Sequence, residues 1–167
     1  MQVEDQLQSL YRMFEEEISA HRGLLEEVER EAECLRKGSI ENLMQAVHRI
    51  EEQTASILRK KKEIGQAIET LRLTLGEKRG ERDLSALIPV LPEAAQQKIK
   101  GYEKALARVR EWIGRRNERN KSFIQEALSC WQNLFSILVQ PLAEAPEYAR
   151  NGQKKQIPAP YALNRKV

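Results

Sequence analysis

The feature that most constrains this fold is a long stretch without proline, which begins after Pro92 and ends at Gln140-Pro141. Proline is accepted in the first turn of a helix and disrupts its interior. Apolar residues recur through the stretch at alternating three- and four-residue steps: Ile99, Tyr102, Leu106, Val109, Ile113, Ala127, Leu134 and Ile137 or Leu138. This is the period of one helical face. The pattern therefore predicts a single helix over residues 93–140, roughly 70 Å long at 1.5 Å per residue.

Two earlier segments carry apolar rows with the same period. Such a long helix cannot bury its apolar stripe alone, so it needs other helices beside it. The first segment has heptad rows Leu7, Phe14, His21, Val28, Leu35 and Tyr11, Ile18, Leu25, Ala32. The second has rows Leu43, Ile50, Ile57, Ile64, Leu71 and Val47, Thr54, Lys61, Ile68, Leu75. These rows predict helices near residues 3–36 and 40–75.

The predicted fold is all-α, an elongated antiparallel bundle of three long helices over residues 1–140. Prolines at 141, 146, 158 and 160, with few apolar residues between them, predict that residues 141–167 form a disordered, flexible tail. Lys37-Gly38 followed by Ser39 reads as a helix end and a new N-cap, so the first two helices form a hairpin. Opposed residues then have numbers that add up to about 76.

This register explains a basic run in the second helix, Arg59 to Lys62, that could otherwise suggest nucleic-acid binding. The run is predicted to lie beside Glu15, Glu16 and Glu17 of the first helix, and charge complementarity between the helices is the favoured interpretation. The net charge of +3 supports it, because the basic residues alternate with nearly as many acidic ones. We expect no nucleic-acid partner.

The sequence also argues against membrane insertion, export and catalysis. It has no run of apolar residues long enough for a membrane span, and its first residues lack the pattern of a signal peptide, so a soluble cytoplasmic protein is expected. Cys34 and Cys130 lack the paired spacing of a zinc site and are expected to be free thiols. His21, on an apolar row, is interpreted as a packed histidine. We expect no catalytic residue, metal or cofactor.

The seam of the long helix turns polar at Arg116, Asn117 and Asn120. Buried amides must find hydrogen-bond partners, so the two asparagines are candidates for setting the register, or simply surface residues. The surrounding basic residues, with Trp112, could bind a nucleic acid. Glu111 and Glu118 interrupt them, and a solvated face is the favoured interpretation.

Beyond residue 121 the long helix becomes apolar on more than one face, in FIQEALSCWQNLFSILV. If Ser39 of the second helix lies opposite Leu128, whatever follows extends past the hairpin by roughly 18 Å. Four large side chains are then left without an internal partner: Trp131, Leu134, Phe135 and Leu138. Two interpretations stay open. Either these residues form a binding surface, or a shifted register or a folded-back tail covers them.

Three short segments resemble the FlgN family of flagellar type III export chaperones. They are DLSALIPVLP between the second and third helices, RNERNKSFIQEAL in the long helix, and EYARNGQ in the tail. The last is similar to a tail element of the family, with Tyr148, Gly152 and Gln153 matching and Ala149 where glycine is usual. The resemblance covers most of the chain, in the same order as in the family.

The resemblance implies a cytoplasmic chaperone without enzymatic activity. Such a chaperone binds the C-terminal helical segments of the hook-associated proteins FlgK and FlgL, prevents their premature assembly and delivers them to the export gate protein FlhA. The client-binding candidates are Phe123, Leu128, Trp131, Leu134, Phe135 and Leu138. The candidates for docking on the export gate are Tyr148, Gly152 and Gln153. The alternative is a self-associating coiled-coil scaffold or adaptor, which would use the same apolar residues to form a homo-oligomer.

Overall fold

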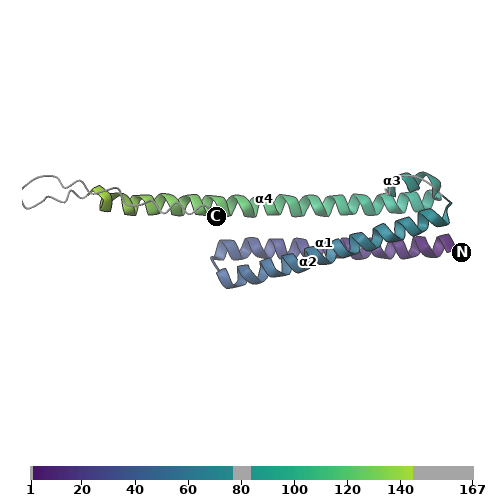
Figure 1. Ribbon diagram of the computed structural model, residues 1–167, viewed down its shortest axis with the longest axis horizontal. Helices are drawn as coiled ribbons and strands as arrows, with labels where there is room; N and C mark the ends of the chain where they lie inside the picture. Colours follow the sequence, from purple (N-terminus) through teal and green to yellow (C-terminus); the bar gives the residue numbers. More distant parts are fainter. Residues whose placement is uncertain (1, 77–83, 145–167) are drawn as a thin grey trace, which may run out of the picture. The chain divides into compact units, whose positions relative to one another are not determined.

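The computed structural model describes residues 2–76 and 84–144, and their regular elements are all helical (Figure 1). They are α1 (Gln2–Lys37), α2 (Ile40–Thr74), α3 (Leu84–Leu87), the 3₁₀ helix η1 (Ile88–Val90) and α4 (Glu93–Glu144). The chain divides into two compact units, residues 1–122 and 123–167. In the first unit three long helices pack against one another, which confirms the predicted all-α class.

The hairpin between α1 and α2 has the predicted register. Gly38 adopts a positive φ of 66°, a conformation that glycine reaches without strain, and Ser39 occupies the N-cap position of α2. The Ser39 side chain makes no capping hydrogen bond. The Lys60 Nζ donates to a Glu16 carboxylate oxygen at 2.8 Å, as the charge pattern predicted. This hydrogen bond and the ammonium charge lower the pKa of Glu16.

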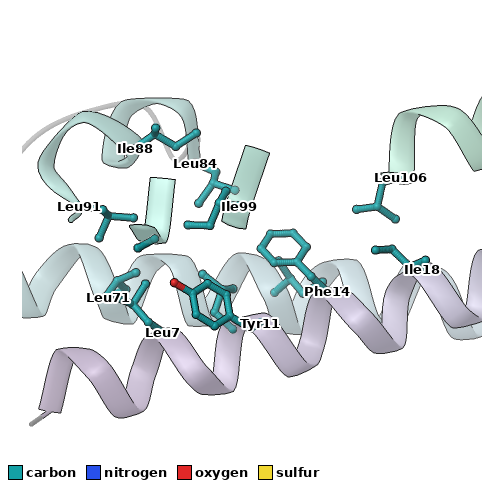
Figure 2. Packing of buried hydrophobic residues seen from close by; sticks show 13 residues of the cluster. Leu7, Tyr11, Phe14, Ile18, Leu71, Leu84, Ile88, Leu91, Ile99 and Leu106 are labelled. Atoms are coloured by element: carbon teal, nitrogen blue, oxygen red, sulfur yellow. The ribbon is translucent and has the colours of Figure 1, made fainter. Parts of the chain in front are cut away.

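The core of the first unit is concentrated where α1, α2 and α4 meet the connector of α3 and η1. Figure 2 shows Leu7, Tyr11 and Phe14 of α1 facing Ile99 of α4, with Leu71 of α2 beside them. The connector contributes Leu84, Ile88 and Leu91 to the same cluster. The segment DLSALIPVLP therefore helps to close the core between α2 and α4. A smaller cluster follows further along, formed by Val28, Val109 and Ile113.

Polar contacts fix α1 and α4 in parallel, with partners on α4 lying 87 to 93 residues further along the chain. The buried Glu17 carboxylate accepts a hydrogen bond from Arg110 Nη2 at 2.7 Å. His21 lies between these two residues. Its Nδ1 is 2.9 Å from the Glu17 carbonyl oxygen, and its Nε2 accepts from Arg110 Nε at 3.2 Å. A carbonyl only accepts and a guanidinium only donates, so this geometry requires a neutral imidazole protonated at Nδ1. His21 is thus a packed residue, as predicted.

Asn120 is the polar seam residue that α1 and α4 bury between them. Its Nδ2 donates to the Val28 carbonyl oxygen at 3.1 Å and to a Glu31 carboxylate oxygen at 2.8 Å. Shifting α4 by one turn would leave this amide buried without partners, which costs about 1–3 kcal/mol. Asn120 therefore sets the register, whereas Asn117 is exposed.

Two details differ from the sequence-based predictions. α4 continues through Pro141 to Glu144, so the predicted end at residue 140 was wrong. Pro141 lies in the last turn of α4, so its missing N–H and the crowding of its ring against the carbonyl four residues earlier disturb only the end of the helix. In α2, Val47 is exposed although it belongs to a predicted apolar row. Thr54 and Lys61 of that row are exposed too, so only its C-terminal part packs against the core.

Replacing Tyr102 by Phe should destabilise the bundle by about 1 kcal/mol at neutral pH, because the Tyr102 hydroxyl donates to the Glu15 carboxylate across α1 and α4. Burial and this hydrogen bond raise the pKa of Tyr102 to about 12. The unfolded chain releases the same proton near pH 10. The wild type therefore loses this contribution between about pH 10 and pH 12, and the Phe variant does not.

Urea unfolding of the two proteins at several pH values checks this prediction. The difference in unfolding free energy should shrink above pH 10, since the other tyrosines and the lysines titrate alike in both proteins. A difference that stays constant up to pH 12 would show that the Tyr102 proton plays no part.

Candidate functional site

The apolar segment of α4, residues 123–139, is the candidate functional site. Trp131, Phe135 and Leu138 are 72%, 69% and 70% exposed. Phe123, Leu128 and Leu134, the other three predicted client-binding residues, are exposed as well. Sequence reasoning left three further exposed apolar side chains out of this set, although they belong to the same run: Ile124, Ile137 and Val139. The site is therefore a continuous stretch of large apolar groups in contact with solvent.

Helix geometry gathers the six predicted client-binding side chains on one side of α4. At 3.6 residues per turn, Trp131, Phe135 and Leu138 lie within a narrow sector of the helix. Phe123 and Leu134 flank this sector on one side and Leu128 on the other, so the six predicted residues span an arc of roughly 140°. The opposite side carries small or polar residues: Gln125, Ser129, Asn133 and Ser136. An apolar arc of this width is typical of a helix that packs on a core.

The electrostatics of the apolar segment differ from those of the preceding part of α4. Between Ser122 and Gln140 the sequence has a single ionisable carboxylate, Glu126, whereas residues 93–121 are rich in Glu, Lys and Arg. A partner that covers the apolar side would desolvate few charges, and removing charges from water is the main electrostatic penalty of association. The segment is suited to an apolar partner helix.

The cysteines and the possible metal-ligating side chains form no metal site among the residues that the structure describes. Cys34 is buried and Cys130 is exposed, and both are free thiols. Within residues 2–76 and 84–144, no group of three His, Cys, Asp or Glu side chains could hold a metal ion. The predicted docking residues Tyr148, Gly152 and Gln153 lie outside the described residues, so their role stays a prediction.

No described helix is long and apolar enough to cross a membrane. In a comparison with protein families, the model described as FlgN protein matches residues 1–156, which is most of the chain. No curated protein and no solved structure gave a match. The family match includes all three segments on which the resemblance was based.

Proposed function

The chain belongs to the FlgN family of non-enzymatic flagellar export chaperones for hook-associated proteins, and on this premise we propose that the apolar segment of α4 holds the client. The single observation that supports this proposal most strongly is the exposure of Trp131, Phe135 and Leu138 on one side of the helix. Buried aromatic anchors dominate the binding energy of many protein interfaces.

The apolar segment meets the physical requirements for binding and shielding the C-terminal helix of a client. The C-terminal helical segment of a hook-associated protein has an apolar side that is covered only after assembly, and before assembly it would associate prematurely. An amphipathic helix can lay its apolar side against another apolar helical surface, with anchors spaced at i, i+3, i+4 and i+7. Trp131, Leu134, Phe135 and Leu138 have this spacing. The apolar segment can therefore shield the client without covalent chemistry or a cofactor.

The family membership supports hook-associated proteins as clients, and the proposal names the partners that the resemblance implies. The clients are FlgK and FlgL, bound through their C-terminal segments, and the receiving component is the export gate protein FlhA. The protein acts in the cytoplasm, where the clients are made. Co-expression with FlgK or FlgL tests the proposal, since a stable complex should co-purify and a fragment of the client without its C-terminal segment should not.

The second candidate function is self-association, because two copies could cover each other's apolar segments. Light scattering of the isolated protein over a hundredfold range of concentration separates the two candidates. A chaperone with a free client surface should bind the client peptide at every concentration. A scaffold should instead increase in mass with concentration and show no affinity for the peptide.

Docking on the export gate is assigned to the segment around Tyr148, in the region 141–167, which can engage a second partner while the helices keep the client. Replacing Tyr148 by Ala should leave client binding and thermal stability unchanged. The same change should lower capture by the cytoplasmic domain of FlhA and reduce secretion of the client. Wild-type capture would refute docking through Tyr148, and a loss of client binding would mean that Tyr148 belongs to the client site.

A further inference from the structure

A second surface with a distinct chemistry lies between α1 and α4 in the first unit. It is a hollow of about 350 Å³. Two residues of α1 and four of α4 line it: Leu25, Glu29, Trp112, Arg115, Arg116 and Arg119. The four α4 residues recur at i, i+3, i+4 and i+7, so they share one side of the helix. None of them belongs to the apolar segment.

The three arginines can bind a new partner at a small cost in free energy, because their contacts within the protein are weak. Arg116 pairs with Glu29 across the helices at 3.2 Å, and Arg115 pairs with Glu111 one turn earlier on α4. All four side chains in these pairs are substantially exposed, and such ion pairs contribute at most about 1 kcal/mol each. Arg119 has no ion pair or hydrogen bond with another residue of the described part of the chain. The guanidinium groups that line the hollow therefore interact only weakly with the rest of the protein.

Trp112 gives the hollow an apolar wall. Its side chain is 50% exposed within a part of α4 that is otherwise strongly charged, and the half-buried Leu25 lies across from it on α1. A tryptophan flanked by arginines is a frequent composition of protein-binding hot spots. The surface therefore combines an apolar contact with positive charge.

We propose that this hollow binds an acidic segment of a partner protein, with two carboxylates about one helical turn apart and an apolar side chain between them. The carboxylates would accept bidentate hydrogen bonds from Arg119 and from Arg115 or Arg116, the geometry for which the guanidinium group is suited. The apolar side chain packs on Trp112 and Leu25. Charge complementarity supports this binding whether or not the apolar segment binds the client.

The distribution of charge favours a protein segment over a nucleic acid. Glu29 lines the hollow, and Glu111 and Glu118 flank the arginines on α4. A nucleic-acid backbone carries a phosphate at every nucleotide and would meet these carboxylates along its path. A peptide can place its two carboxylates opposite the arginines and leave neutral residues opposite the glutamates.

Tryptophan fluorescence tests the proposal in the full-length chain. The sequence has two tryptophans, so the substitution W131F leaves Trp112 as the reporter. The probe is a helical 15-residue peptide without tryptophan that carries two Glu four positions apart and a Leu between them. The control peptide has Gln in place of both Glu. We expect a saturable change in Trp112 emission with the Glu peptide and at least about tenfold weaker binding of the Gln peptide.

Two matched arginine variants locate the site. Arg119→Gln should weaken binding of the Glu peptide at least about fivefold, because it removes a carboxylate partner from the hollow. Arg108→Gln changes an exposed α4 arginine outside the hollow and should have no effect. Equal losses in both variants, equal affinity of the two peptides, or no saturable change would overturn the proposal. If a twelve-nucleotide oligo-dT bound more tightly than the Glu peptide, the assignment to a protein partner would be overturned.

Discussion

Replacing Ile99 by alanine is expected to lower the free energy of unfolding by about 2–5 kcal/mol, the usual result when a buried isoleucine is truncated. Ile99 is fully buried in the cluster that joins α4 to α1, α2 and the connector (Figure 2). Truncation removes apolar contacts with all of these elements and leaves a cavity that a close-packed core fills only in part. Urea unfolding followed by circular dichroism measures the change.

The matched control is Ile137→Ala, the same substitution in the same helix. Ile137 is exposed, so its truncation should change stability by no more than about 0.5 kcal/mol. A control as damaging as Ile99→Ala would mean that Ile137 is covered in the free protein. The apolar segment would then be part of the core, and the proposal that it is available to a client would fail.

The double variant Trp131→Ala, Phe135→Ala is expected to weaken client binding by at least about 2 kcal/mol, which is about thirtyfold in Kd. Both side chains are among the most exposed apolar groups of α4, and each would lose most of its solvent contact under a client helix. Calorimetric titration with a C-terminal peptide of FlgK or FlgL measures the affinity. Circular dichroism of the free variant should show unchanged helicity, because alanine favours helix formation.

Ser129→Ala, Ser136→Ala is the matched double control. These residues occupy the opposite side of the same helical turns, where the proposal places no client. The control should bind the peptide with wild-type affinity. Unchanged affinity in the aromatic variant, together with a loss in the control, would move the binding surface to the polar side of α4.

The helical architecture could be predicted from the sequence because it depends on local signals. Heptad rows, the proline at 92 and the Lys37-Gly38 turn defined three helices close to those observed, except that α4 continues through Pro141. The register of the hairpin followed from chain connectivity, and the Lys60–Glu16 ion pair agrees with it. These features do not depend on where distant parts of the chain meet.

The parts that could not be predicted depend on tertiary contacts. The periodicity of α2 indicates that Val47 and Leu43 occupy apolar rows, but it carries no information on how far α4 covers each row. In the same way, the sequence pattern does not distinguish Asn120 from Asn117, because both lie on the polar part of the seam. Only the positions of the Val28 carbonyl and the Glu31 carboxylate decide that Asn120 is the buried one.

The candidate site was partly predictable for the same reasons. An apolar run on several faces of one helix is visible in the sequence, and the exposure of Trp131 and its neighbours agrees with it. The hollow at Trp112 was missed, because its arginines were interpreted as a solvated face. Leu25 and Glu29 come from a helix far away in the sequence, and pairing them with Trp112 and Arg116 required the structure.

Site-specific photocrosslinking shows directly whether the apolar side of α4 contacts the client. A photoreactive phenylalanine analogue would replace Phe135 in one protein and Ser129 in another, and each would be irradiated with a FlgK or FlgL C-terminal segment. We expect a crosslink to the client from position 135 and none from position 129. A complex that forms but crosslinks only from position 129, or equally from both positions, would contradict this expectation.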